Sequence, residues 1–144
     1  MEQAKGLLEK EKEYLFEKSL LDSLLNYVPD AIYFKDLNSK FIRASKSIEE
    51  FGNHVSSLEV IGKSDFDYYD KEVAEKFYKE EQKIIESGMG VESDIIEDKL
   101  PDGTVVYISS TKQPLKDVEG QIIGTMGLSR NVTKYINFKQ NHKD

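Results

Sequence analysis

The sequence contains no cysteine, only two histidines and no long apolar run. Without cysteine there are no disulfides, no thiolate catalysis and no zinc sites built on cysteine, and a reducing compartment is the natural setting. No segment approaches the roughly 18 apolar residues that a membrane-spanning helix requires. The Glu- and Lys-rich N-terminus also lacks the apolar core of a signal peptide. We therefore expect a cytoplasmic protein with no membrane contact by this segment.

Several functional signatures are missing as well. The chain has no glycine-rich phosphate loop, no histidines at metal-ligand spacing and no Ser/His/Asp set. Its 27 acidic and 20 basic residues give a net charge of −7, and no concentrated basic surface is present to bind phosphates. With so many carboxylates, the close spacing of Asp65 and Asp67 does not mark a catalytic pair. We expect neither an enzyme nor a nucleic-acid partner, and no catalytic or metal-binding residue.

Residues 91–131 are the most informative stretch. Three β-prone runs are separated by the turns PDG and VEG, in which Gly103 and Gly120 supply the positive φ that most residues resist. This pattern predicts an antiparallel meander. Three strands cannot bury both faces, so the first ninety residues must cover one of them.

The N-terminal residues 3–28 have a helical pattern. Apolar residues recur every seven positions (Leu7, Tyr14, Leu21 and Val28), and Pro29 ends the helix. This amphipathic helix either packs on its own domain or forms the end of a coiled coil that pairs two subunits. Glu11 and Lys18 interrupt the seam, and both interpretations remain open.

The segment between helix and meander contains two short strands, short helices and one longer helix. Residues 30–36 and 40–44 form a hairpin in which Asn38 is expected to take the left-handed conformation. Asp70 begins the longer helix, which runs to Ser87 and ends at Gly88. The predicted fold is α+β, a five-stranded antiparallel sheet with the helices over one face.

In three places the sequence resembles PAS domains, the sensory modules of histidine kinases and diguanylate cyclases. The matches are residues 61–67, entering the helical crossover, residues 102–117, a strand and its exit, and residues 123–133, the last strand. The resemblance implies sheet order 2-1-5-4-3, a pocket between sheet and helices, and signal relay by terminal helices. We divide the chain into an N-terminal helix (1–28), the PAS domain (29–133) and the start of an output helix or tail (134–144).

Differences from members of that family that bind cofactors reduce the number of cofactors this chain could bind. Light-sensing relatives need a cysteine, and haem-binding relatives commonly use a histidine on the long crossover helix, where residues 71–87 contain none. His54 and His142 lie in a polar loop and in the tail, as solvated residues do. Haem and flavin are therefore disfavoured, which leaves a small anionic metabolite or no ligand.

Lys112 lies in a predicted central strand among serines and threonines. Alternation puts it on one face with Ile108 and Ser110, and the resemblance favours this face for the pocket. A two-residue turn at Asp102-Gly103 would place Ser93 opposite Lys112; a three-residue turn would place Asp94 there, which we prefer because a carboxylate offsets the cost of burying an ammonium. Our hypothesis is that Lys112, held by Asp94 or Asp65, binds an anionic ligand group, and that further residues line the cavity (Tyr33, Tyr69, Ser110 and Met126). The alternative is that Lys112 reaches past the strand edge into water.

The functional prediction is a PAS sensor of a histidine kinase, two-component or cyclase system, homodimeric through its N-terminal helix, that relays ligand or partner binding to an attached enzyme. One alternative is a ligand-free dimerisation module. The other is a small enzyme resembling ketosteroid isomerase, although here the helices fall between the second and third strands and not mainly before the sheet.

Overall fold

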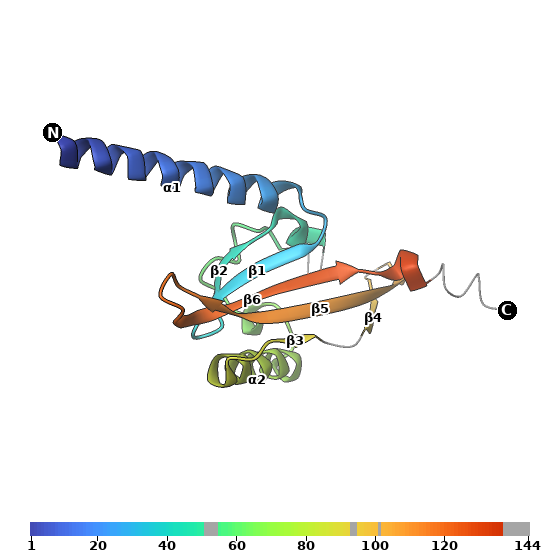
Figure 1. The fold of residues 1–144 in the computed structure, drawn as a ribbon. Coiled ribbons are helices and arrows are strands. Elements are labelled where there is room, and N and C mark those ends of the chain that lie inside the picture. The colour runs from blue at the N-terminus through green and yellow to red at the C-terminus, as the bar shows by residue number, and fades with distance from the viewer. Residues whose placement is uncertain (51–54, 93–94, 101, 137–144) are drawn as a thin grey trace.

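The computed structural model describes residues 1–50, 55–92, 95–100 and 102–136 (Figure 1). Its elements follow in the order α1 (Glu2–Tyr27), β1 (Ala31–Asp36), β2 (Phe41–Ala44), the 3₁₀ helices η1 (Lys46–Glu50) and η2 (Asp65–Asp67), α2 (Lys71–Ser87), β3 (Val91–Glu92), β4 (Ile96–Lys99), β5 (Val105–Lys116) and β6 (Ile122–Asn131). The predicted α+β class is confirmed.

All strands belong to one antiparallel sheet with the order β2-β1-β6-β5-β3, in which β4 also pairs with β5. This is the predicted order 2-1-5-4-3, with the third predicted strand divided into β3 and β4. Val91 lies opposite Lys112 and Ile96 lies opposite Ile108, so this edge contains one residue more than β5 over the same distance. An extra residue of this kind interrupts the ladder.

The pairing at Lys112 differs from the prediction. The Leu100 N–H donates to the Thr104 carbonyl (2.8 Å) and Lys99 lies opposite Val105, so the turn closes one residue earlier than an Asp102-Gly103 loop would. Val91, and neither Ser93 nor Asp94, therefore lies opposite Lys112. Ser93 and Asp94 themselves lie outside the described residues.

The β1–β2 hairpin forms as predicted but with a different left-handed residue. Ser39 has a φ of 61°, and Asn38 is not among the residues with positive φ. The Asp36 carboxylate accepts hydrogen bonds from the N–H groups of Asn38 (2.8 Å) and Lys40 (3.0 Å), which fixes the turn. A side chain of α2, Gln82, donates to the Leu37 carbonyl (2.9 Å) and ties the hairpin to the helix.

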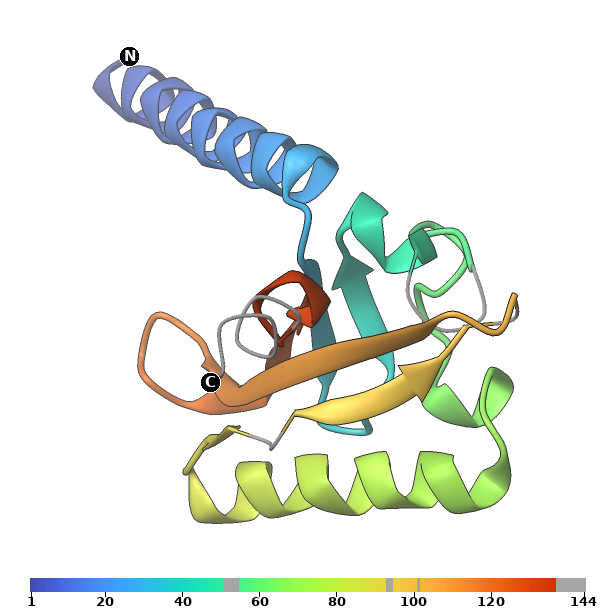
Figure 2. The same cartoon turned by 90° about the vertical axis from the view of Figure 1, so that its right-hand side faces the viewer.

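The helix α2 covers one face of the sheet, as Figures 1 and 2 show from two directions. It ends where predicted, at Gly88, whose φ of 71° is a left-handed cap. Ala74 and Ile84 are completely buried beneath the sheet. The layer between α2 and the sheet is therefore where buried side chains of both elements meet.

The helix α1 projects away from the sheet in both views (Figures 1 and 2). Leu25 is its one buried residue, and the Asp22 carboxylate pairs with Arg43 of β2. Leu21 is half-buried, and the other large apolar residues are exposed and spread around the helix (Leu7, Leu8, Tyr14, Leu15, Phe16, Leu20, Leu24 and Tyr27). Of the two interpretations left open, packing along its own domain therefore holds only for the last turns of α1.

After β6 the chain continues into a helical turn at residues 133–136. The Thr133 hydroxyl accepts from the Tyr107 N–H (2.8 Å), which holds this turn against β5. Of the predicted output segment, residues 137–144 lie outside the described part of the chain. None of the described helices has the length and apolar character needed to cross a membrane.

Candidate functional site

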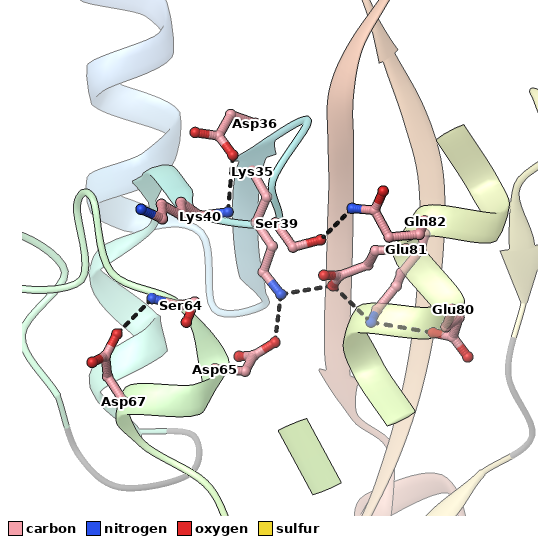
Figure 3. A network of polar contacts seen from close by, with 11 residues as sticks. Lys35, Asp36, Ser39, Lys40, Ser64, Asp65, Asp67, Glu80, Glu81 and Gln82 are labelled. Atoms are coloured by element: carbon pink, nitrogen blue, oxygen red, sulfur yellow. Dashed lines mark hydrogen bonds and ion pairs between the residues drawn. The ribbon is translucent and has the colours of Figure 1, made fainter. Parts of the chain in front are cut away.

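Five charged side chains from four elements meet between the sheet and α2 (Figure 3). Lys35 of β1 contacts Asp65 of η2 and Glu81 of α2, with both N–O distances at 2.6 Å. Lys112 of β5 contacts the same Glu81 at 3.0 Å and Glu80 at 3.1 Å. We call these five residues the charged cluster.

The charged cluster is deeply buried on one side. The side chains of Lys35 and Glu81 are 2% and 1% exposed, and only Glu80 is partly open to solvent, at 35%. Removing an ion from water costs several kcal/mol even after relaxation, so such groups persist only when they are closely paired. Two ammonium groups and the two most buried carboxylates meet this condition.

Aromatic rings complete the surroundings of both lysines. The Lys35 ammonium lies 4.8 Å from the centre of the Phe41 ring and 5.5 Å from that of Tyr33. The Lys112 ammonium lies 4.9 Å from the Phe77 ring. These are cation–π distances. The rings therefore stabilise the ammonium groups on the sides that carboxylates do not contact.

One oxygen of the charged cluster has no hydrogen-bond partner among the described residues. Glu81 accepts both lysines through Oε2, whereas its Oε1 is buried and accepts no hydrogen bond from any residue that the structure describes. A carboxylate has about four acceptor positions, so Oε1 could take two donors. Buried acceptors without a donor are rare in native proteins.

The sheet register explains how Tyr33 and Lys112 come to share a face. Tyr33 of β1 and Lys112 of β5 both lie opposite Gly127 of the intervening strand β6. A Cβ atom at Gly127 would overlap the Tyr33 ring, so the glycine leaves the space in which that ring lies. Glycine at this position thus lets an aromatic ring lie across the central strand beside the charged cluster.

The side chain of Lys112 stays protonated. Burial alone would lower the pKa of its ammonium, but interactions with Tyr33, Glu81 and Glu80 outweigh burial and raise that pKa above its usual value. Lys112 is therefore a permanent cation at neutral pH. It serves as an ion-pair partner and not as a general base.

Tyr69 lies at the edge of the same region. Its ring contacts Phe77 edge-on, with centroids 5.6 Å apart, and the residue is 38% exposed. Burial, followed by the nearby Asp65 carboxylate, raises the pKa of the Tyr69 phenol to about 12. The hydroxyl therefore stays protonated and can donate a hydrogen bond at neutral pH.

Among the residues singled out from the sequence, Lys112, Tyr33 and Ser110 share the sheet face that α2 covers. This is the face that the family resemblance favoured, and Lys112, 6% exposed, does not reach into water. Asp65 is present too, but it pairs with Lys35 and not with Lys112. Asp94, the preferred partner, lies outside the described residues, and Glu80 and Glu81 pair with Lys112 in the structure.

The prediction that Met126 lines the same cavity is wrong. Met126 lies opposite Phe34 and Gln113 in the ladder, between Thr125 and Gly127 along β6. Since side chains alternate along a strand, Met126 lies on the face away from Lys112. The sequence could not establish this because the faces of a strand depend on its register.

Three residues of the charged cluster were not predicted from the sequence: Lys35, Glu80 and Glu81. Glu81 lies seven residues after Ala74 and three before Ile84, inside the apolar stripe of its helix, and a carboxylate there is a signal of buried pairing. Lys35 shares a strand face with Tyr33, two residues away. No group of three or more potential ligands is arranged to hold a metal ion within the residues that the structure describes.

Comparison with known proteins gives the family. The family model described as the PAS fold matches residues 25–135. A solved PAS domain from Colwellia psychrerythraea shares the fold, with 24% identity, a TM-score of 0.61, and coverage of 84% of this chain and 98% of that chain. A comparison with curated proteins found no match.

Two solved structures of VqmA are also similar. The Vibrio cholerae VqmA dimer, described as giving insight into DNA binding by LuxR-type receptors, is 29% identical over 78% of this chain and 50% of that chain, with a TM-score of 0.69. VqmA bound to DPO is 29% identical over 76% of this chain and 55% of that chain, with a TM-score of 0.67. This chain thus spans about half the length of the VqmA chains.

These findings correct the expectation of no nucleic-acid partner, because a receptor that resembles this chain is a DNA-binding protein. The exclusion rested on a net charge of −7, which describes this chain alone. Charge in one part of a regulator carries no information about surfaces elsewhere in it. This chain belongs to the PAS-fold family, as the family-model match over residues 25–135 shows and as the sheet order and the similar structures agree.

Proposed function

We propose that this PAS domain is a ligand-binding sensor that takes up a small molecule beside the charged cluster. The observation that carries the proposal is Glu81, a buried carboxylate that pairs with two lysines while its other oxygen has no donor in the part of the chain that the structure describes. Apolar residues of similar volume are often as stabilising as a buried ion pair, so stability alone does not account for the cluster. VqmA, 29% identical, is a precedent because it binds DPO.

The ligand would act through the ends of the domain. Asp30, just before β1, and Arg130, near the end of β6, form an ion pair at 2.9 Å and lie next to α1 and the turn at 133–136. A ligand that favours one sheet geometry can shift both ends only by its differential affinity for the two states. We further propose that the domain itself is not catalytic and that it works in the cytoplasm.

Native mass spectrometry of the purified chain, followed by thermal unfolding with added DPO, tests the proposal. We expect either a co-purified small molecule or an increase in unfolding temperature with DPO, because a ligand that binds only the native state stabilises it by mass action. Neither a bound mass nor a shift with DPO, at saturating concentrations, would contradict ligand binding of this kind.

We also propose that two copies pair through α1. Its exposed apolar residues and its projection from the sheet support this, and VqmA is described as a dimer. Light scattering on the whole chain and on a chain lacking residues 1–20 tests it. We expect the whole chain to be a dimer and the truncated chain to be a folded monomer. The same number of subunits per particle in both would refute the pairing.

For the regulator that carries this domain we propose an output on DNA, by analogy with VqmA. A kinase or cyclase output is the competing prediction from the family resemblance. Gel-shift titrations of that regulator with genomic fragments, in the presence and absence of DPO, separate the two. Autophosphorylation without any DNA shift would favour the kinase.

A further inference from the structure

The unpartnered atom of the charged cluster is an acceptor, and this restricts what can bind there. Glu81 Oε1 is a buried carboxylate oxygen that accepts no hydrogen bond from the described residues, while Oε2 of the same group takes both lysines. A buried acceptor is satisfied only by a donor. A hydroxyl or N–H group would complete it, whereas a ligand carboxylate or phosphate would not.

The charge balance also argues against an anion. Lys35 and Lys112 face Asp65 and Glu81, and Glu80 adds a further carboxylate at 3.1 Å from Lys112. The cluster therefore has no surplus positive charge, although a buried lysine considered alone would attract an anion. Adding a negative group would bury charge without compensation.

A cationic donor is disfavoured for a different reason. The Glu81 carboxylate already has two ammonium groups on Oε2, at 2.6 and 3.0 Å. A third cation on Oε1 would lie close to both and be repelled by them. An uncharged donor avoids this repulsion and keeps the hydrogen bond.

The surroundings favour a flat, apolar body for this ligand. Tyr33 lies over Gly127, Phe77 lies beneath the Lys112 ammonium, and Tyr69 contacts Phe77 edge-on. Tyr69 is also 38% exposed, so part of this side chain is open to solvent. Aromatic rings prefer such offset or edge-on neighbours.

We propose that the ligand of this domain is a small uncharged ring compound whose hydroxyl or N–H group donates a hydrogen bond to Glu81 Oε1. This inference rests on the proposed ligand-binding function and names the chemical class. It replaces the anionic ligand that the lone lysine in the sequence had indicated.

Four single-ring probes test the class with the whole chain: phenol, anisole, benzylamine and benzoate. Dissociation constants come from titrations of the isotope-labelled protein followed by two-dimensional NMR. We expect phenol to bind about tenfold or more tightly than anisole, which lacks only the donor. Benzylamine and benzoate should be weaker than phenol because each adds an unfavourable charge.

The variant Glu81→Gln gives the sharper result. Its amide oxygen would turn toward the two ammonium groups and place an NH₂ donor where Oε1 stood, so benzoate should overtake phenol. Glu80→Gln is the matched control, because it removes the same charge from a neighbouring partner of Lys112 and leaves Oε1 intact. The wild-type order of affinities should survive in Glu80→Gln.

The outcomes are distinct. If benzoate binds the wild type best, ligand binding stands and the donor class is overturned. If Glu80→Gln reverses the order as Glu81→Gln does, net charge and not Oε1 decides, which also overturns the inference. If no probe binds, the class is refuted, while native mass spectrometry and DPO still decide the proposed function. Should Glu81→Gln fail to fold, the ratio of phenol to anisole affinity in the wild type is sufficient to support or refute the donor class.

Discussion

At the scale of single residues, Lys35 shows how tightly the site constrains the protein. Its ammonium is 2% exposed and lies 2.6 Å from both Asp65 and Glu81. If the lysine is removed, Asp65 stays buried without its cation and Glu81 keeps only Lys112 as a partner. An isolated buried charge is far less favourable than a buried pair.

Replacing Lys35 with methionine should therefore lower the free energy of unfolding by about 3–5 kcal/mol, the range for breaking one side of a buried ion pair. Urea denaturation monitored by circular dichroism measures it. Lys18→Met is the control, since Lys18 forms an exposed pair with Asp22 on α1, and it should change stability little. Similar losses in both variants would show that burial of the charged cluster has been overstated.

Tyr69 makes a prediction about alkaline pH. Burial and the Asp65 carboxylate raise the pKa of its phenol from 10.0 to about 12. The unfolded chain then loses this proton first, so the contribution of Tyr69 to stability is present below pH 10 and is lost as the pH rises towards 12. Lys112, whose pKa is raised from its usual 10.5, acts in the same direction above pH 10.5.

Urea denaturation at several pH values should show a falling stability between pH 10 and 12 that is shallower in Tyr69→Phe. Tyr27→Phe removes a hydroxyl from a side chain that is 86% exposed, and it serves as the control. A slope that is identical in Tyr69→Phe and wild type would show that the phenol ionises equally in both states.

At the scale of elements, the sequence predicts what local pattern determines. Gly88 ends α2 and Gly120 takes the positive φ of the last turn, because those positions need a residue without Cβ. What it could not predict are pairings between strands. The position of Val91 opposite Lys112 depends on which residues close the turn and on one extra residue between β3 and β4, and neither is visible in composition.

The charged cluster was half predictable for the same reason. Lys112 stands out as a lysine in a β-prone run, and Glu81 interrupts an apolar stripe, so each is a local anomaly. Their meeting, and that of Lys35 with Asp65, joins β1, η2, α2 and β5. Contacts over such sequence separations follow from tertiary packing and not from propensity.

Gly127 of β6 tests this packing. A methyl group there would overlap the Tyr33 ring, so Gly127→Ala should displace the ring and cost about 1–3 kcal/mol of stability, as overpacking does. Near-ultraviolet circular dichroism and urea denaturation report the ring and the stability. Gly6→Ala, on exposed α1 with nothing within 4 Å, should instead be neutral or slightly stabilising. Unchanged stability in Gly127→Ala would place the Tyr33 ring elsewhere.

At the scale of the whole molecule, both ends of the PAS fold are fastened at one corner. Asp30 follows α1 and accepts from Nε and Nη2 of Arg130, near the end of β6. One residue beyond, the Asn131 side chain accepts from the N–H of Thr133 (3.0 Å) and orders the turn that leaves the domain. The Asp30–Arg130 contact therefore joins the segment after α1 to the segment that leads into the C-terminal turn.

Asp30→Asn should loosen both ends together and leave the sheet intact. Arg130 is exposed, and exposed ion pairs contribute little to global stability, so the unfolding midpoint should hardly move. Hydrogen exchange should instead quicken in residues 24–30 and 130–136, while α2 and β5 keep their protection. Lys116→Met at the far end of β5 should leave both terminal regions unchanged. Faster exchange at only one of the two ends would mean that the ion pair does not couple them, and the relay would need a separate path to each helix.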